Sequence, residues 1–355
     1  MSKTFILHQD TDNWYVNKNL LYMLWFDPSL WTIIFDNDEI FLIFDPRYIQ
    51  RAKDLKNSHF EKFFWKKMKI QNILLDDNSR DKIEDIIKWK EVIIESNVPT
   101  YFYKFMKKTE IKDLEFVDNI FEEKRLIKKE NEIQIIKKSI LIVNKVYKEV
   151  EKMIKFWKII WKKEIELRKI IQKLIIDNWW DDESFPSIIA FWKNSAIPHH
   201  EAWNTIISNW PLLIDMWVKY NYYLSDFSRS LWVWEKNKDY EEFQKILEIV
   251  KSAYQLWEKF IKDKNSVYAF INDENSKIKW SDIDKVIRDY ISNEWYWEYF
   301  THSSWHWVWL QAHEKPFLSK NKWNDLIKKW MVIAMEPWIY LPWKFWVRRE
   351  NTIIL

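Results

Sequence analysis

Five of the seven histidines lie in two short clusters near carboxylates. The first cluster is His199 and His200, and the second is His302, His306 and His313. A lone histidine is usually structural, whereas histidines gathered among acidic residues are typical of metal and proton-transfer sites. The chain has 0 Cys, which excludes a thiol nucleophile and a thiolate metal site. The histidine clusters are therefore the first candidates for chemistry.

Two acidic residues are expected to face each other across a hairpin near the middle of the chain. If Tyr220-Asn221 is a two-residue turn, Asp215 lies directly opposite Asp226 on one face of the hairpin. Directly opposed Cβ atoms are about 4.5–5.5 Å apart, so two carboxylates there repel each other. A cation between them would remove this repulsion.

A second acidic pair is expected near the C-terminal end. A tight turn centred on position 343 pairs Glu336 with Glu350. Arg348 shares a strand face with Glu350, because side chains two residues apart point the same way, and it is placed to hold a carboxylate.

Together the two Asp, the two Glu and a histidine would form an oxygen-rich site suited to hard divalent ions. Two such ions about 3.5–4 Å apart generate a bound hydroxide and polarise a carbonyl. The alternative is structural, because exposed acidic residues on hairpins are common and each pair alone indicates little. The coincidence of two facing pairs with clustered histidines favours the metal site.

The elements that must position these residues follow from apolar periodicity. Short apolar runs predict strands in the first third of the chain, including one hairpin, and a spacing of three and four residues predicts helices later. The predicted strands are 32–35, 40–44, 73–75 and 92–94, and the predicted helices are 133–150, 164–176 and 240–264. The change of pattern predicts two domains, 1–125 and 126–355.

Charge and hydropathy exclude some partners and indicate a compartment. The net charge is only +3, so we expect no nucleic-acid partner. No apolar run reaches the roughly 18 residues of a membrane span, so we expect no membrane partner. With 0 Cys, the chain fits a reducing cytoplasm, and a cytoplasmic location is expected.

The amino-acid composition is abnormal in one respect. The chain has 0 Gly and 27 Trp, although roughly 25 glycines are expected at this length. Several tryptophans stand beside Pro or Asn at predicted turns, where glycine is the usual residue; examples are Trp210, Trp338 and Trp343. Our hypothesis is that the gene uses UGA for glycine and that the written sequence reads UGA as tryptophan. A tryptophan-rich binding surface is the alternative, and it would place the rings on one repeating face.

With tryptophan read as glycine, five segments resemble the signatures of the Xaa-Pro peptidases, which are the aminopeptidase P and prolidase family. The segments are SFPSIIAFWKNSAIPH (184–199), LID through SDFSR (213–229), HSSWHWVWLQAHE (302–314), EPWIY (336–340) and VRRE (347–350). Residues 19–26 and 45–48 resemble the creatinase-type N-terminal domain. The resemblance spans nearly the whole chain and implies an α+β fold: a creatinase-like α/β N-terminal domain followed by a pita-bread catalytic domain.

The resemblance implies a dinuclear metallopeptidase that cleaves the bond between an N-terminal residue and a following proline, as an aminopeptidase or a dipeptidase. By this resemblance, His306 and Glu336 hold one divalent ion and Asp215 the other, while Asp226 and Glu350 bridge them. Manganese is the usual ion in relatives, with cobalt or zinc as alternatives. A metal-bridging hydroxide would attack the carbonyl.

The resemblance also assigns proton transfer and substrate contacts. Glu336 would accept the proton, and His313 would contact the scissile group. His199 would contact the intermediate or the leaving nitrogen, and His302 the proline end. Relatives commonly form dimers, so a homodimer is implied, although no partner surface is visible in the sequence.

Two departures and two alternatives remain. The family often has Gly at Tyr222 and Thr at Ala334. A non-catalytic relative acting as a binding module would be expected to lose a ligand, and all five are present here. A metal-independent relative such as creatinase shares the fold without the five-ligand set.

Overall fold

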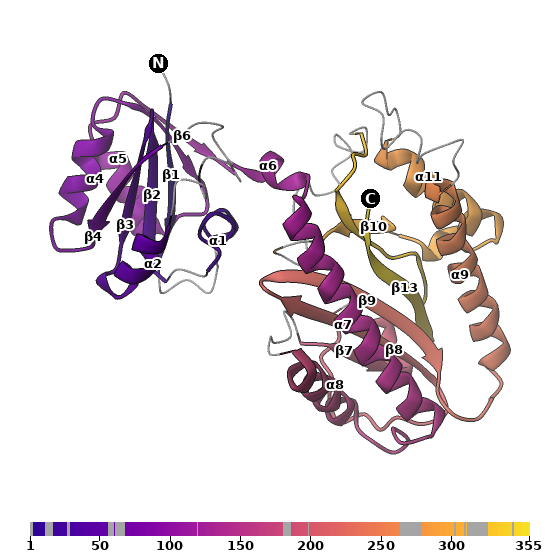
Figure 1. Cartoon of the computed structure of the whole chain (residues 1–355). Helices are drawn as coiled ribbons and strands as arrows, with labels where there is room; N and C mark the ends of the chain where they lie inside the picture. Colours follow the sequence, from indigo (N-terminus) through magenta and orange to yellow (C-terminus); the bar gives the residue numbers. More distant parts are fainter. Residues whose placement is uncertain are drawn as a thin grey trace. The chain divides into compact units, whose positions relative to one another are not determined.

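The computed structural model describes residues 3–10, 17–26, 29–55, 60, 68–118, 120–179, 186–197, 199–262, 279–301, 303–308, 310, 326–342 and 344–355. The chain divides into two compact units, Met1–Arg125 and Leu126–Leu355 (Figure 1). Among these residues, no helix is both long and apolar enough to cross a membrane.

The N-terminal unit is built on a mixed sheet with the strand order β4-β3-β2-β1-β5-β6. Its strands are β1 (Thr4–Gln9), β2 (Trp31–Asp36), β3 (Glu39–Phe44), β4 (Lys69–Leu74), β5 (Glu91–Glu95) and β6 (Asp113–Val117). The helices are α1 (Lys18–Leu24), α2 (Ile49–Asp54), α4 (Ser79–Ile87) and α5 (Thr100–Lys108). The predicted hairpin is present as β2 and β3, which pair antiparallel. The apolar faces of α4 and α5 pack on this sheet and form its core.

The second unit is built on a sheet with the strand order β10-β11-β13-β9-β8-β7, with β12 paired to β13. Its strands are β7 (Ile188–Phe191), β8 (Pro211–Tyr220), β9 (Tyr223–Trp232), β10 (Trp305–Trp307), β11 (Val332–Met335), β12 (Trp338–Leu341) and β13 (Phe345–Ile354). The helices are α6 (Glu122–Leu126), which spans the division, α7 (Glu130–Lys155), α8 (Glu164–Trp179), α9 (Tyr240–Lys262) and α11 (Trp280–Asn293). The three helices predicted from periodicity correspond to α7, α8 and α9.

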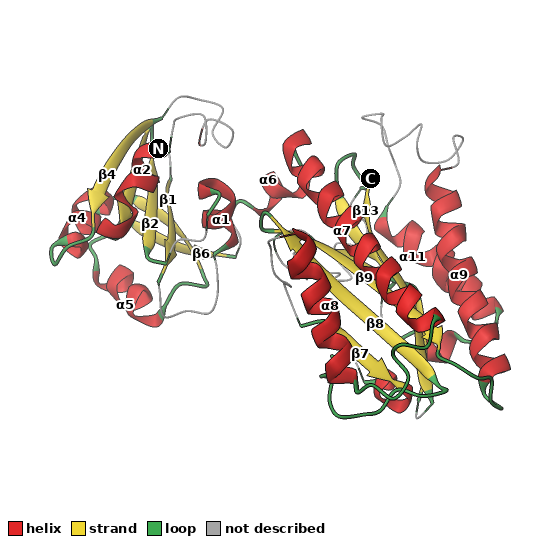
Figure 2. Cartoon of the chain, turned by 60° about the horizontal axis from the view of Figure 1, so that its bottom comes forward, coloured by secondary structure: helices red, strands yellow, loops and turns green. Residues whose placement is uncertain are grey.

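Two helix pairs cover this sheet at different strands. Residues of α7 and α8 form one apolar core with β7, β8 and β9, and residues of α9 and α11 form another with β10 to β13. Figure 2 shows α7 and α8 lying along the β7, β8 and β9 strands. Because each helix is apolar on one face only, packing on the sheet buries the apolar faces of both the helices and the strands. The long strands β8, β9 and β13 therefore each have one face covered by helices.

The register predicted for the β8–β9 hairpin is wrong by one step. Asp215 pairs with Ser228, and Asp226 pairs with Trp217. The turn is Asn221-Tyr222, whose φ angles are 46° and 70°, because a two-residue hairpin turn of this kind requires positive φ at both central positions. Asp215 and Asp226 therefore share a face as diagonal neighbours and are not directly opposed.

The register predicted for the C-terminal hairpin is confirmed. Trp338 pairs with Arg348 in β12–β13, and Met335 pairs with Asn351 in β11–β13. Both pairs are symmetric about position 343. The short break between β11 and β12 thus brings Glu336 level with Glu350.

Candidate metal centre

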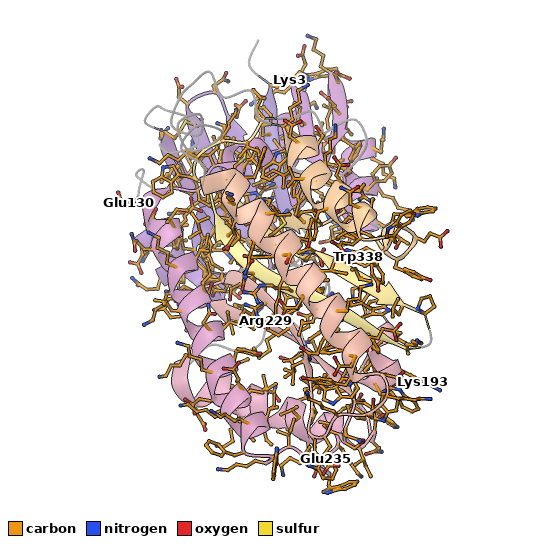
Figure 3. All side chains as sticks on the ribbon, turned by 90° about the vertical axis from the view of Figure 1, so that its right-hand side faces the viewer. Lys3, Glu130, Lys193, Arg229, Glu235 and Trp338 are labelled. Carbon is orange, nitrogen blue, oxygen red and sulfur yellow. The ribbon has the colours of Figure 1, made fainter. Side chains whose placement is uncertain are left out.

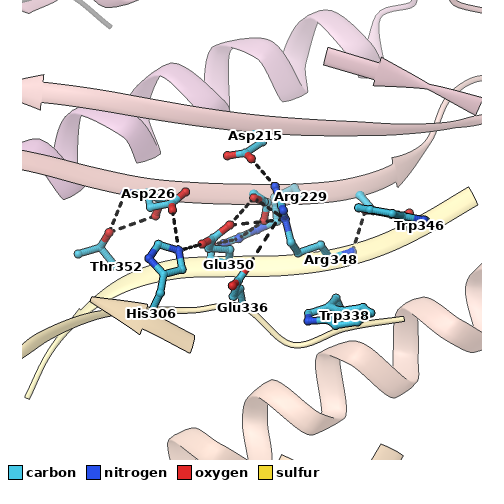
Figure 4. Close-up of polar contacts among 12 residues, drawn as sticks. Asp215, Asp226, Arg229, His306, Glu336, Trp338, Trp346, Arg348, Glu350 and Thr352 are labelled. Carbon is cyan, nitrogen blue, oxygen red and sulfur yellow. Dashed lines mark hydrogen bonds and ion pairs between the residues drawn. The ribbon is translucent and has the colours of Figure 1, made fainter. Parts of the chain in front are cut away.

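Five side chains predicted as metal ligands come from five segments of the second unit. Asp215 lies on β8, Asp226 on β9, His306 on β10 and Glu350 on β13. Glu336 lies at the break between β11 and β12. Figure 4 shows the five side chains pointing toward one another across the sheet. The tertiary structure therefore brings together residues up to 135 positions apart in the chain.

His306 connects two of the acidic residues. Its Nε2 lies 3.2 Å from Asp226 Oδ2 and 3.3 Å from Glu350 Oε1. One ligand atom from each of these three residues lies within 4.8 Å of the other two. Three donors at this separation are close enough to bind one common ion.

Arg348 occupies the other side of the cluster. It forms an ion pair with Asp215, its Nε lies 3.5 Å from Glu350 Oε2, and its Nη1 lies 3.9 Å from Glu336 Oε2. The buried cluster thus sets four carboxyl groups against one guanidinium and one imidazole. The predicted role of Arg348 in holding a carboxylate agrees with these contacts.

Two further residues of β9 support the cluster and were missed from the sequence. Ser228 donates to Glu350 Oε2 at 2.5 Å and accepts from Arg348 Nε at 3.0 Å. Arg229, labelled in Figure 3, donates to the backbone carbonyl of Glu350 at 2.6 Å. Ser228 stands two residues after Asp226, so strand alternation places both on one face, and this signal was available in the sequence.

The donor chemistry fits divalent cations. Asp215, Asp226 and Glu350 are buried, with exposed fractions of 3%, 1% and 1%. Asp215 Oδ1 and Asp226 Oδ1 are buried and accept no hydrogen bond from the described residues, and Asp226 Oδ2 faces the ring of His306. Buried carboxylate oxygens without donors are costly unless a cation compensates them. Oxygen ligands with one imidazole suit hard or borderline divalent ions.

The carboxyl groups of the cluster have strongly perturbed pKa values. Burial raises the pKa of Asp226 well above its usual value, and the charge of Glu350 adds to this. Burial and Glu350 likewise raise the pKa of Glu336 to about 8. Burial opposes ionisation of Glu350, but the hydrogen bond from His306 and the charge of Arg348 outweigh it and lower its pKa to about 2. Metal binding would displace protons from such groups.

The three histidines predicted to contact substrate are only partly described. His199 is exposed and has a φ of 57°. His302 and His313 lie outside the described residues. His200, the neighbour of His199, is bound to Glu164, with 2.9 Å between Nε2 and Oε2.

A family model described as Metallopeptidase family M24 matches residues 134–355. The chain belongs to this family. The matched part contains all five predicted metal ligands, which we call the acidic cluster: Asp215, Asp226, His306, Glu336 and Glu350. Metallopeptidases of the M24 family use divalent metal ions.

Known relatives of this M24 chain extend the similarity to both units. It is 31% identical to the Xaa-Pro dipeptidase of Pyrococcus horikoshii over 96% of this chain and 88% of that protein. It is 27% identical to a putative Xaa-Pro aminopeptidase of Mycoplasma genitalium over 96% of this chain and 88% of that protein. The solved prolidase of Pyrococcus furiosus superposes with a TM-score of 0.78 at 26% identity, covering 99% of this chain and 93% of that structure. The prediction of the Xaa-Pro peptidase family is confirmed by these relatives. The predicted α+β fold, creatinase-like and then pita-bread, is confirmed as well.

Proposed function

We propose that this M24 chain hydrolyses the peptide bond between an N-terminal residue and a following proline, using two divalent cations. The observation that carries the proposal is a buried cluster in which His306 contacts Asp226 and Glu350, while Arg348 contacts Asp215, Glu336 and Glu350. One oxygen each of Asp215 and Asp226 is left without a donor among the described residues. The similarity to proteins named Xaa-Pro dipeptidase and prolidase supports the substrate class.

We assign the five ligands to two ions. His306 and Glu336 would hold one ion, Asp215 would hold the other, and Asp226 and Glu350 would be ligands shared by both. The close approach of His306 to both Asp226 and Glu350 supports the shared position of those two carboxylates. Two divalent cations held by shared carboxylates acidify a water molecule and polarise the carbonyl it attacks.

Glu336 is the residue that accepts the proton of the attacking water at a carboxylate oxygen. It lies at the break between β11 and β12, and its side chain is 12% exposed, so part of it reaches solvent. Its Oε2 is 3.9 Å from Arg348 Nη1, which is too far for a hydrogen bond, so this guanidinium leaves the oxygen available to accept a proton.

The selectivity for proline has a physical basis. The nitrogen of an Xaa-Pro bond carries no hydrogen, so the site needs no acceptor for it. We assign His313 to the scissile group, His199 to the intermediate or the leaving nitrogen, and His302 to the proline end. The exposed position of His199 agrees with a role in contacting a ligand.

Manganese is the proposed ion, with cobalt or zinc as alternatives, because the ligands are mostly carboxylates. A cytoplasmic location and a homodimer complete the proposal. The cytoplasmic location rests on the 0 Cys of the chain.

A non-catalytic binding module is the competing proposal. The fold is shared with the N-terminal domain of the FACT complex subunit SPT16 from chickpea, at a TM-score of 0.78 and 15% identity. The name of that protein does not describe a peptidase. The fold alone therefore does not imply peptidase activity, and the complete ligand set favours the enzyme.

The test compares hydrolysis of an Xaa-Pro dipeptide with that of a longer peptide that begins Xaa-Pro, with and without manganese. The protein is made with glycine at the tryptophan positions that the recoding hypothesis assigns to glycine and, in parallel, as written. Metal-dependent cleavage of either peptide supports the proposal, and the relative rates separate dipeptidase from aminopeptidase. Cleavage of neither peptide by metal-loaded protein would favour the binding module.

A further inference from the structure

Glu164 is a buried carboxylate outside the acidic cluster. It is the first residue of α8, and its exposed fraction is 0%. Its Oε1 accepts from the Phe191 N–H at 2.7 Å and from Asn194 Nδ2 at 2.9 Å. Its Oε2 lies 2.9 Å from His200 Nε2 and accepts from the Trp203 N–H at 3.2 Å. Each carboxylate oxygen of Glu164 therefore has two hydrogen-bond partners.

The four donors all belong to one segment, residues 191–203, which we call the histidine loop. Burial opposes ionisation of Glu164, but the hydrogen bonds from His200 and Asn194 outweigh it, and its pKa is lowered. A charged acceptor makes these hydrogen bonds stronger than neutral ones. Glu164 thus fixes the start, the middle and the end of the loop to α8.

A second contact ties the histidine loop to the strand that carries Glu350. The Trp346 N–H donates to Ser195 Oγ at 3.2 Å, and Ser195 Oγ donates to the Trp192 carbonyl at 2.6 Å. Trp346 precedes Glu350 by four residues on β13. The loop is therefore held between α8 and the strand of a proposed metal ligand.

His199 is an exposed residue within this held loop. It stands directly before His200, in the left-handed region and exposed. The His200 N–H donates to the Ile197 carbonyl at 3.2 Å, which closes a turn around His199. With the His200 ring bound to Glu164, the backbone of His199 is fixed on its C-terminal side.

We propose that Glu164 is a positioning residue that sets the placement of His199 toward substrate through the histidine loop. This inference rests on the proposed function, in which His199 contacts the substrate. A displacement of about 1 Å can cost on the order of 100-fold in rate, so loss of the Glu164 contacts should be visible in turnover.

Glu164→Gln tests the proposal, because the amide keeps the shape but places a donor among donors. We expect kcat/KM for the Xaa-Pro dipeptide to fall about 100-fold, with bound metal unchanged. In a His199→Ala background the same substitution should change kcat/KM by less than about 2-fold, because the side chain that Glu164 positions is then absent. An equal loss in both backgrounds, or no loss in either, would overturn the proposal.

Glu132→Gln is the matched control. Glu132 is equally buried, lies in the first turn of α7, and accepts instead from the Lys129 N–H and the Tyr223 hydroxyl. Both variants should lose thermal stability, but only Glu164→Gln should speed amide exchange in residues 192–200, by about tenfold. If Glu164→Gln leaves amide exchange in these residues unchanged, the positioning role of Glu164 is wrong, even if the unsubstituted protein is inactive. An inactive metal-loaded parent instead overturns the proposed function, and the role of His199 with it.

Backbone angles carry a second, independent inference. Of the twelve residues with positive φ in the described part of the chain, eight are tryptophan. These are Trp25, Trp89, Trp157, Trp161, Trp192, Trp234, Trp295 and Trp330. A residue with a Cβ is strained in this region, and glycine is not.

Two of these tryptophans occupy the position where helices most often carry glycine. After α7, the Trp157 N–H bonds to the Ile154 carbonyl and the Lys158 N–H to the Met153 carbonyl. This is the paired pattern that ends a helix with one left-handed residue, which is usually glycine.

The same pair of hydrogen bonds ends α11. The Trp295 N–H bonds to Ser292 and the Tyr296 N–H to Ile291. Trp295 is 86% exposed and Trp157 is 64% exposed, so neither residue gains enough burial to offset the strain.

We infer that the eight left-handed tryptophans are glycine in the native protein, as UGA recoding would produce. Peptide mass mapping of the protein isolated from its own cells should find glycine at 157 and 295. Tryptophan at these positions would overturn the inference.

Trp157→Gly and Trp295→Gly in the chain as written should each raise Tm by about 2–4 °C. Trp157→Ala and Trp295→Ala are the controls, because alanine removes the indole but keeps the Cβ. A gain from alanine equal to that from glycine would show that backbone strain is not the cause.

Discussion

Arg348 and Asp215 form an ion pair although strand β9 lies between the strands that carry them. Arg348 on β13 reaches across the face of β9 to Asp215 on β8, and on the way its Nε contacts Ser228. The guanidinium thereby links the three central strands of the second unit. The same group is 3.5 Å from Glu350, so it orients carboxylates that we assign to both ions.

Arg348→Lys should weaken metal binding and turnover by about 10–100-fold. Lysine keeps the positive charge but cannot contact several oxygens in one plane. Calorimetric manganese titration and steady-state kinetics measure the two losses. Arg349→Lys is the control, because the neighbouring side chain points to the other face of β13 and lies over Tyr254 at 5.1 Å. Equal behaviour of the two variants would remove the orienting role of Arg348.

Ser228→Ala should lower metal affinity by about tenfold. It deletes the hydroxyl that donates to Glu350 Oε2 and accepts from Arg348, so Glu350 loses one of the groups that orient it. Ser225→Ala is the matched control on the same strand, because the Ser225 hydroxyl is buried without a hydrogen-bond partner among the described residues. Metal titration of both variants checks the difference, and an unchanged affinity in Ser228→Ala would contradict it.

Asp226→Asn should abolish turnover and also stabilise the metal-free protein. A bridging ligand serves both ions, so its loss removes both from their working positions. Without metal, the buried Asp226 carboxylate lies among other acidic groups, and a neutral amide should raise the free energy of unfolding by on the order of 1 kcal/mol. Urea unfolding with a chelator present measures the gain. Full turnover, or a less stable metal-free variant, would show that the ligand assignment is wrong.

Stability of the N-terminal unit should fall in mild acid because of His8. Burial lowers the pKa of His8 to about 3, and its ring nitrogens lie 2.8 Å from Thr32 Oγ1 and 3.0 Å from the Tyr101 hydroxyl. The unfolded chain therefore binds this proton more tightly than the folded chain. The contribution of neutral His8 to the free energy of unfolding is complete above about pH 6.5. It is lost as the pH falls toward 3, by up to about 1.4 kcal/mol per pH unit.

Urea unfolding of the full chain at pH 7 and pH 5 measures this loss. His8→Gln keeps a polar side chain that cannot titrate, so its unfolding free energy should depend less on pH over the same interval. An equal pH dependence in the parent and the variant would assign the loss to other groups.

The elements of the fold were largely predictable because their signals are local. Apolar spacing located α7, α8, α9 and the β2–β3 hairpin, and the residues about position 343 gave the register of β13. The β8–β9 register was misplaced because the turn was centred one residue early. The deciding feature is positive φ at both Asn221 and Tyr222, and a tyrosine at the second position hides that preference.

The candidate site was predictable as a set of residues but not as an arrangement. The five ligands stand in recognisable motifs, yet no motif indicates that Ser228 contacts Glu350 or that Glu164 holds the histidine loop. Glu164 precedes the loop by more than 25 residues, and its position at a helix start resembles an ordinary capping residue. Only the packing of α8 against the loop gives it four donors.

The sequence by itself determined which residues can do chemistry, because acidic and histidine side chains carry their ligand atoms wherever they stand. It also raised the hypothesis that glycine stands where several tryptophans are written, because the 0 Gly and 27 Trp are counted without any structure. The tertiary structure alone decided which carboxylates share a buried space, which of their oxygens lack donors, and which cation offsets their charge. These depend on strand order and register, through which residues distant in sequence are desolvated together.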